Sequence, residues 1–314
     1  MRVFSAVVLA LLTLGRLPPA QPPAATSLAR QFAAIAKPAG GRVGAAALLV
    51  ETGARASLRG DERFPMQSVF KLPVALHVLH EADAGRMPLS REIALTKADL
   101  RGTGGIDPIG GRWPDGVTLT VEELARRMVS NSDNTAVDAL MALSGGPAAV
   151  TRRLKDLGIP GIRVDRGERE LARDLSGPTP AKERAAFARY AHDLRDTAAP
   201  DAAVDLLAKI ARGDEQLAPA SHDRLLKWMI ETSTGSSRIK GRLPAGTVVA
   251  HKTGTGPDVA GINSVTNDIG VITLPNGRHL AIAVFVATSS KPIETREAAI
   301  AQIARAAYDY FAGK

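Results

Sequence analysis

The period of the apolar residues changes four times along this chain of 314 residues, and this alternation constrains the fold more than any other feature. A helical pattern over 26–37 comes first, and two strand patterns follow it, at 42–50 and after the turn at 51–54. Helical patterns then continue as far as residue 231. Strand patterns return at 247–251, 264–274 and 279–287, and a helical pattern over 292–311 closes the chain.

Strands from the two ends of a chain can share one antiparallel sheet, with the terminal helices on one of its faces. We therefore predict an α/β (α+β) fold in which residues 26–64 and 236–314 form an α/β lobe. Residues 65–235 are inserted between these two parts and form an all-helical lobe. A site at the junction would receive side chains from both lobes.

The inserted segment carries a series of helical patterns separated by two irregular stretches. The predicted helices are at 68–84, 121–130, 134–143, 147–157, 181–195, 201–212 and 221–231. Residues 95–116 are rich in Gly and Pro and are predicted as loop. Residues 158–180 are also irregular, and a loop of this length inside a compact domain usually has a function.

The N-terminus has the features of an export signal. Met1 and Arg2 give a positive start, residues 3–14 are apolar, and residues 16–25 are rich in Pro and Ala. We predict a signal peptide over 1–25, cleaved after Ala20 or Ala25; an uncleaved anchor is the alternative. The mature protein would be periplasmic or secreted, without stable insertion into the membrane.

The composition excludes several classes of site. Cysteine is absent, so the chain has no disulfide scaffold, no Cys-based zinc site and no thiol nucleophile. The net charge is +8, but the basic residues are scattered and aromatic residues make up only 4% of the chain. This pattern indicates a solvated basic surface, and nucleic acid is not expected as a partner.

A serine and a lysine lie three residues apart at the start of the helix predicted over 68–84. Residues i and i+3 share one helix face, so the Lys71 amine can lie beside the Ser68 hydroxyl. The positive end of the helix dipole suits a nucleophile that carries charge into a covalent intermediate. About one S-x-x-K pair is expected by chance in a chain of this length. Indeed a second copy, Ser237 and Lys240, lies in a loop, and we interpret it as coincidence.

Two further motifs have both a functional and a structural interpretation. Residues 132–134 read S-D-N at the start of a helix, where all three residue types are also favoured caps. Ser132 could relay a proton and Asn134 could orient a substrate. Residues 252–255 read K-T-G-T at the end of a strand, where Gly254 would let a ligand approach the backbone. The alternative for this motif is a simple strand-end turn.

Together and in this order, the motifs S-x-x-K, S-D-N and K-T-G resemble the set of the class A β-lactamases and penicillin-binding proteins. The surrounding sequences, RFPMQSVFK at 63–71 and VAHKTGT at 249–255, extend the resemblance to class A β-lactamases. Gln67, His251 and the sequence NDIG at 267–270 are most similar to the PER-type branch. The resemblance covers residues 28–312.

The resemblance implies a role for each motif residue. Ser68 would attack the β-lactam carbonyl, and the backbone N–H groups of Ser68 and Thr255 would form the oxyanion hole. Lys71 would share the general-base work of acylation with a glutamate. Ser132 would pass a proton to the leaving nitrogen, and Asn134 would orient the substrate amide.

The remaining residues implied by the resemblance surround the substrate. Lys252, Thr253, Gly254 and Thr255 would bind it, with the carboxylate held by the lysine and the two threonines. Arg238 matches a position from which some class A enzymes supply a carboxylate-binding arginine; the alternative is a surface arginine. Ile106 stands where the family usually has an aromatic residue at the pocket mouth. Trp113 could compensate, or could simply pack in the core.

The sequence RGEREL at 166–171 resembles the Ω-loop of the family, whose glutamate activates the deacylating water. Glu168 matches that glutamate, and Glu170 is the alternative. Two departures bear on deacylation. Ala172 replaces the asparagine that helps to hold the water in the family. The loop from Glu168 to the helix at Pro180 is also predicted to be shorter than usual, which would leave the floor of the pocket more open.

The resemblance therefore predicts a hydrolase that opens the ring of penicillins and cephalosporins through a serine acyl-enzyme. It implies no metal and no organic cofactor, and we expect a monomer with β-lactams as its small-molecule partners. Two alternatives stay open. A cell-wall DD-peptidase, or penicillin-binding protein, would share Ser68, Lys71, Ser132 and Lys252 without needing Glu168. A β-lactam sensor would be acylated and remain so.

Overall fold

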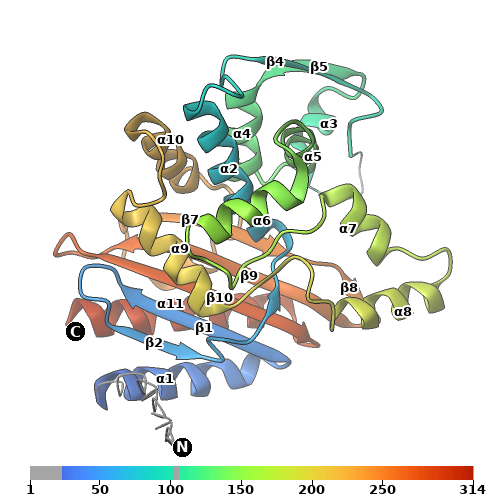
Figure 1. Ribbon diagram of the computed structural model, residues 1–314. Helices are drawn as coiled ribbons and strands as arrows, with labels where there is room; N and C mark the ends of the chain where they lie inside the picture. The colour runs from blue at the N-terminus through green and yellow to red at the C-terminus, as the bar shows by residue number, and fades with distance from the viewer. Residues whose placement is uncertain (1–22, 102–105, 314) are drawn as a thin grey trace, which may run out of the picture.

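The computed structural model describes residues 23–101 and 106–313, and one antiparallel sheet forms its centre (Figure 1). The strand order is β2-β1-β10-β9-β7, with β8 pairing with β9 off this path. The strands are β1 (Arg42–Leu49), β2 (Arg55–Leu58), β7 (Val249–Thr255), β8 (Asp258–Val259), β9 (Ile262–Thr273) and β10 (His279–Ser289). Strands β1 and β10 run in register from the pair Arg42–Ala287 to the pair Leu49–Leu280. The prediction that both ends of the chain share one sheet is therefore confirmed.

Both faces of this sheet are covered. Successive side chains of a strand point to opposite faces, and along β1 Ala45 and Ala47 belong to one hydrophobic core while Ala46 and Leu48 belong to the other. The first core lies against α1 (Pro23–Ala36) and α11 (Ile293–Ala312). The second lies against α9 (Pro200–Arg212) and the inserted helices. Burial on both faces explains why β1 and β10 read as nearly continuous apolar runs.

The inserted segment packs around one central helix. Every residue of α2 (Lys71–Asp83) from Lys71 to Leu79 is buried. The helices around it are α4 (Val121–Ser130), α5 (Asn134–Leu143), α6 (Gly146–Asp156) and α10 (Pro219–Ile230). A helical insertion between the two halves of an antiparallel sheet confirms the predicted fold class.

The structure differs from the sequence prediction in the stretch predicted as loop at 95–116. This stretch contains α3 (Pro108–Arg112). It begins in β4 (Glu92–Thr96) and ends at the first residue of β5 (Gly116–Thr120), and these two strands pair in antiparallel orientation. The two strands are short, and about twenty residues separate them. Because a long connection and not a tight turn joins them, only the tertiary fold brings them together.

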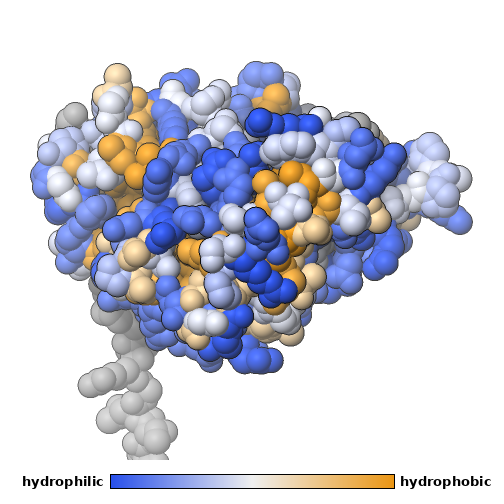
Figure 2. Space-filling view, turned by 90° about the horizontal axis from the view of Figure 1, so that it is seen from above, coloured by the Kyte–Doolittle hydropathy of each residue, from blue (hydrophilic) through white to orange (hydrophobic). Residues whose placement is uncertain are grey.

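The second irregular stretch belongs to a long excursion of the chain, from Arg166 to Asp196. It ends directly before β6 (Thr197–Ala198), which pairs with β3 (Phe64–Pro65). The excursion contains α7 (Glu168–Leu175) and α8 (Pro180–Tyr190), and in Figures 1 and 2 these helices project from one side of the molecule. Its two ends are joined by Arg166 Nε and Asp196 Oδ2, 2.6 Å apart, and the backbone N–H groups of Asp165 and Arg166 donate to Asp196 Oδ1.

The prediction of a shortened loop that ends at Pro180 is therefore wrong. Asp196, thirty residues after Arg166, closes the loop, so α8 lies inside the excursion. Pro180 and Pro200 both start helices with proline in the first turn, a favoured position. The sequence pattern predicts that the loop ends at the first of these helices, whereas the loop closes only after it.

Two predictions concern the N-terminus. Residues 1–22 of the predicted signal peptide lie outside the described residues, and Pro23–Ala25 form the beginning of α1. Among the helices that the structure describes, none has both the length and the hydropathy that a bilayer crossing requires.

Candidate active site

Ser68 lies in a short 3₁₀ turn, η2 (Gln67–Phe70), directly before α2. The predicted helix therefore begins as this turn, and α2 proper begins at Lys71. Gln67 has a φ of 46°, a left-handed conformation that is uncommon outside glycine. Its side chain donates to Tyr190 Oη at 2.8 Å, and Asn267 Nδ2 donates to the carbonyls of Pro65 and Met66. The turn that presents Ser68 is thus held from two sides.

The Lys71 amine is the centre of the site. It is fully buried, and its Nζ donates to Ser68 Oγ at 3.0 Å and to the Ser132 carbonyl at 2.7 Å. It also contacts Asn134 Oδ1 at 2.5 Å and Glu168 Oε1 at 3.0 Å. Glu168 Oε1 is itself 3.4 Å from Ser68 Oγ. One serine hydroxyl therefore has both an amine and a carboxylate within reach.

The structural and the functional interpretation of the S-D-N motif apply to different residues of the motif. Asp133 caps α5: its carboxylate accepts from Ala136 N and Ile109 N, both at 2.8 Å, and burial raises its pKa. Ser132 has a φ of 60° and its hydroxyl accepts from Lys252 Nζ at 2.9 Å. The capping interpretation thus holds for Asp133, while the two flanking polar residues face Lys71 and Lys252.

Glu168 is the first residue of α7 and is buried. Asp138 on α5 holds this helix end, because its two carboxylate oxygens accept from Glu168 N at 2.7 Å and Arg169 N at 3.0 Å. A carboxylate at a helix N-terminus is favoured by the helix dipole. A Cβ atom on Gly167 would lie only 2.6 Å from Asp138 Oδ1, so a larger residue here would require the Asp138 carboxylate to shift. Glu170 is an exposed residue that forms an ion pair with Arg173 at 4.0 Å.

Lys252 enters the site from β7. Its side chain is fully buried, and burial lowers its pKa well below the ordinary value, helped by the nearby charge of Lys71. Strand β7 passes very close to the turn that carries Ser68: a Cβ on Gly254 would lie 2.3 Å from the Met66 carbonyl oxygen. The glycine of the K-T-G motif is therefore required by the packing of β7 on η2.

Arg238 lies behind the end of β7 and is not a surface residue, since only 5% of it is exposed. Its guanidinium donates to Thr255 Oγ1 at 2.7 Å, to the Gly254 carbonyl at 3.2 Å and to Glu297 Oε1 at 3.0 Å. Thr255 is exposed. Because Arg238 donates to the Thr255 oxygen, the hydroxyl hydrogen of Thr255 is available to another acceptor.

Ile106, which is expected at the mouth of the site, has an apolar side chain that is 43% exposed. Its carbonyl accepts from Asn134 N at 2.9 Å, so this residue is tied directly to the S-D-N motif. Trp113 packs against the hydrophobic core and lies under the guanidinium groups of Arg112 and Arg127. The packing interpretation of Trp113 is therefore the correct one.

Sequence reasoning missed Asp138 and the closing residue Asp196. A signal for Asp138 was present: it lies four residues after Asn134 on the same helix, and such residues share one face. Asn134 reaches Lys71 from this face while Asp138 reaches the start of α7. No comparable signal marks Asp196, because its pairing with Arg166 depends on the path of the whole excursion.

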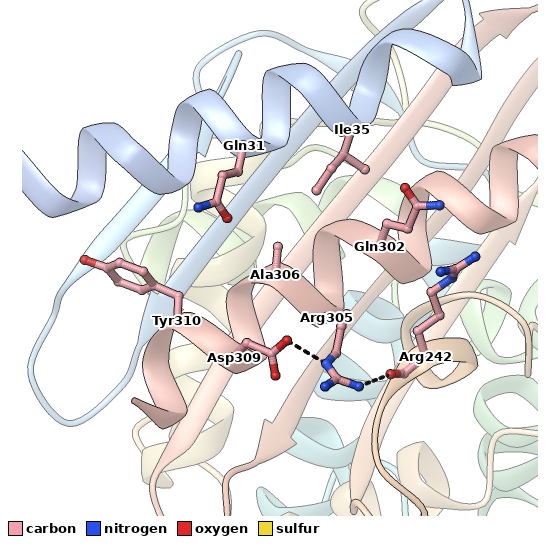
Figure 3. A pocket seen from close by; sticks show the side chains of 8 residues that line it. All are labelled: Gln31, Ile35, Arg242, Gln302, Arg305, Ala306, Asp309 and Tyr310. Atoms are coloured by element: carbon pink, nitrogen blue, oxygen red, sulfur yellow. Dashed lines mark hydrogen bonds and ion pairs between the residues drawn. The ribbon is translucent and has the colours of Figure 1, made fainter. Parts of the chain in front are cut away.

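A cavity of about 530 Å³ is lined by residues of α1 and α11 and by Arg242 (Figure 3). It lies between α1 and α11, on the face of the sheet opposite to the inserted helices, with Gln31 on one side and Gln302 on the other. Arg305 pairs with Asp309 there at 2.7 Å. None of the predicted site residues lines it. Across the described part of the chain, no group of three or more His, Asp or Glu residues is arranged to hold a metal ion.

Comparisons with known proteins agree with this geometry. A model of the beta-lactamase enzyme family matches residues 27–311. The extended-spectrum beta-lactamase PER-1 of Pseudomonas aeruginosa is 39% identical over 249 residues, which cover 79% of this chain and 76% of that protein. Beta-lactamase VEB-1 of the same organism is 38% identical over 258 residues, covering 82% and 81%.

Solved structures give the same result. A beta-lactamase from Chitinophaga pinensis DSM 2588 superimposes with a TM-score of 0.82 at 37% identity, covering 90% of this chain and 98% of that one. The TLA-3 extended-spectrum beta-lactamase has a TM-score of 0.83 at 34% identity, covering 92% and 99%.

Proposed function

Since the chain belongs to the class A β-lactamase family, with PER-type relatives, it is a β-lactam hydrolase, and we propose that it opens the ring through an acyl-enzyme on Ser68. The observation that carries this proposal is the convergence of Lys71 Nζ and Glu168 Oε1 on the Ser68 hydroxyl. A serine hydroxyl is a weak nucleophile until an adjacent base takes its proton.

Acylation begins when Ser68 Oγ attacks the β-lactam carbonyl carbon. The hydroxyl proton passes to Lys71 or to Glu168, since each has an atom within 3.4 Å of Ser68 Oγ. The oxygen of the tetrahedral intermediate is stabilised by the backbone N–H groups of Ser68 and Thr255. The close packing of β7 on η2 at Gly254 supports this pairing of two N–H groups from distant parts of the chain.

Ring opening requires a proton on the leaving nitrogen. Ser132 supplies it, because its oxygen already accepts from Lys252 and its own hydrogen is free to be donated. Asn134 uses its Oδ1 to accept from Lys71, which leaves its NH₂ group to bind the substrate amide. Lys252, Thr253 and Thr255 bind the substrate carboxylate, and Arg238 acts through the Thr255 hydroxyl.

Deacylation depends on Glu168. Its carboxylate takes a proton from a water molecule, which then attacks the ester carbonyl of the acyl-enzyme. Asp138 positions this carboxylate by holding the first two N–H groups of α7. The presence of a buried glutamate beside the nucleophile favours hydrolysis over the DD-peptidase and sensor alternatives, which do not need it.

The test is continuous turnover of a chromogenic cephalosporin by the purified protein, followed by mass spectrometry of the acyl-enzyme. We expect steady turnover, and an adduct on the peptide that contains Ser68. Ser68→Ala should abolish hydrolysis in a protein that still folds, since only the nucleophile is lost. Ser237→Ala, in the second S-x-x-K sequence, is the matched control and should keep full activity.

A single stoichiometric burst without turnover would favour the sensor, and cleavage of D-Ala-D-Ala peptides would favour the peptidase. An adduct on Ser237 would contradict the assignment of Ser68. We further propose that the protein is exported, with residues 1–25 as its signal peptide, and that it acts as a monomer. Mass spectrometry of the mature N-terminus and light scattering test these two points.

A further inference from the structure

A second polar cavity lies within the excursion that carries Glu168. It has a volume of about 380 Å³ and is enclosed by α7, α8 and the segment after α8. Its charged lining consists of Arg166, Arg173, Asp174, Arg189, Asp193 and Arg195. Arginines thus outnumber carboxylates in the lining by four to two.

The two aspartates of the lining are already engaged by two of the arginines. Asp174 lies 2.8 Å from Arg166 Nη1 and 3.3 Å from Arg195 Nη2. Asp193 lies 3.2 Å and 2.7 Å from the same two nitrogens. These four residues form a network in which each carboxylate is shared, and Asp196 adds a third carboxylate to Arg166 at 2.6 Å. Asp174 and Asp193 are therefore not available to the other two arginines.

The remaining donors of the cavity lack such partners. Arg189 on α8 has no ion pair with any residue in the described part of the chain, and Arg173 on α7 has only the exposed Glu170 at 4.0 Å. At the base, Arg166 is only 4% exposed, and its Nη2 atom is buried without a hydrogen-bond partner among the described residues. Buried donors are normally paired, and two cationic side chains lining one cavity repel one another.

We propose that this cavity binds a free tetrahedral oxyanion, such as inorganic phosphate or sulfate, between Arg173, Arg189 and the Nη2 atom of Arg166. Guanidinium groups suit this ligand because their planar N–H donors match the oxygens of an oxyanion in pairs. The anion would offset the repulsion between α7 and α8 and satisfy the buried donor. A dianion bound here would bridge Arg173 on α7 and Arg189 on α8.

The site has a consequence for catalysis, and this part rests on the proposed function. Arg166 lies two residues before Glu168, and Arg173 is on the helix that Glu168 begins. An anion that fixes both arginines therefore steadies the segment that holds the deacylating carboxylate. Occupancy of the cavity should accelerate deacylation without altering the groups around Ser68.

The first test measures binding alone. Inorganic phosphate is titrated into the purified protein at constant ionic strength, with chloride as the balancing anion, and heat of binding and Tm are recorded. We expect a saturable binding isotherm and a rise in Tm that follows it, because a ligand of the folded state stabilises it by mass action. Arg189→Ala and Arg173→Ala should each weaken binding by at least about tenfold, the loss typical of a charge-assisted hydrogen bond.

Arg184→Ala is the matched control, since Arg184 is an exposed arginine on α8 that does not line the cavity. It should leave phosphate affinity unchanged. The proposal is overturned if phosphate gives no saturable rise beyond that of chloride, or if Arg184→Ala weakens binding as much as Arg189→Ala. Ser68→Ala protein should bind phosphate normally, so a failure of the catalytic assignment is distinguishable from a failure of this site.

Discussion

At the scale of single residues, two buried lysines and one buried carboxylate give this site its chemistry. Lys71 and Lys252 are both fully buried, yet each has polar partners: Lys71 contacts Ser68 and Glu168, and Lys252 contacts Ser132. Buried charges are tolerated only when they are paired and hydrogen-bonded. The cost of burying them is evidence that the arrangement serves a function.

Replacing Glu168 tests the deacylation step. We expect Glu168→Gln to form the acyl-enzyme and then hold it, because the amide cannot take a proton from the attacking water. Stopped-flow kinetics with a chromogenic cephalosporin should show a burst followed by turnover slower by on the order of a hundredfold or more. Glu170→Gln is the control on the same helix and should remain close to wild type. Rapid turnover by the Glu168 variant with loss in the Glu170 variant would reverse their roles.

The ionisation of Asp138 should make the free energy of unfolding depend on pH. Burial raises the pKa of this carboxyl above its ordinary value near 3.8, although two backbone N–H groups donate hydrogen bonds to it. The folded state therefore keeps the proton over a range in which the unfolded state has lost it. The free energy of unfolding contributed by this group falls as pH rises through that range.

Asp138→Asn removes this titration. From pH 4 to pH 7 the stability of the variant should improve relative to wild type, although the amide loses one of the two backbone hydrogen bonds and costs about 1–3 kcal/mol at the acid end. Urea unfolding of both proteins across this range provides the measurement. Parallel pH profiles would mean that Asp138 is ionised equally in the folded and unfolded states.

At the scale of elements, the site depends on how closely β7 packs on the turn that carries Ser68. The two elements come from residues almost two hundred positions apart, and a side chain at Gly254 would collide with the backbone of the turn. This packing brings the K-T-G motif to the nucleophile. A small displacement of β7 would separate Lys252 from Ser132 and Thr255 from the substrate.

Gly254→Ala should therefore lower kcat/KM by on the order of a hundredfold, because a misplacement of about 1 Å has effects of this size. The new methyl group would lie 2.3 Å from the Met66 carbonyl, so β7 must shift. Gly111→Ala in α3 is the control: no atom lies within 4 Å of its added Cβ. That variant should keep wild-type kinetics, and it should change the free energy of unfolding by about 1 kcal/mol at most. Equal kinetics for the two variants would contradict the packing argument.

At the scale of the whole molecule, the excursion between Arg166 and Asp196 is the feature that borders the site, because it carries Glu168. Its second helix, α8, projects from the body, and the face seen in Figure 2 carries no large hydrophobic patch at that end. The surface of α8 that is buried comprises Ala186, Phe187 and Tyr190, and Tyr190 reaches back to Gln67 beside the nucleophile. The size and direction of this excursion therefore bear on which substrate side chains are accepted.

We expect both penicillins and cephalosporins to be substrates at comparable efficiency. The chain's relatives include proteins described as extended-spectrum beta-lactamases. The resemblance also implies that Ile106 stands where the family usually has an aromatic residue, and α8 projects outward. The ratio of kcat/KM for cefotaxime to that for benzylpenicillin should lie within about tenfold of unity, as about 1–2 kcal/mol of pocket preference gives. Steady-state kinetics decides the point, and a penicillin preference on the order of several hundredfold would show that the pocket excludes bulky side chains.

The sequence alone determined the features that depend on neighbours along the chain. The spacing of Ser68 and Lys71 predicts that they meet, because residues three apart share a helix face, and they do at 3.0 Å. The alternation of periods predicted the shared sheet and the inserted helices. The order and sequence of the motifs identified Ser132, Glu168 and Lys252. The resemblance implied where these motifs lie in the fold.

Only the tertiary structure decided which distant groups touch. It brought Asp196 to Arg166, thirty residues away, and so showed that the loop carrying Glu168 is long where the sequence predicted a short one. It also placed Asp138 under the start of α7 and Arg238 behind Thr255. The physical reason is that helical and strand periods encode only which face of an element a residue occupies. A contact between two elements depends on the path of all the chain that lies between them.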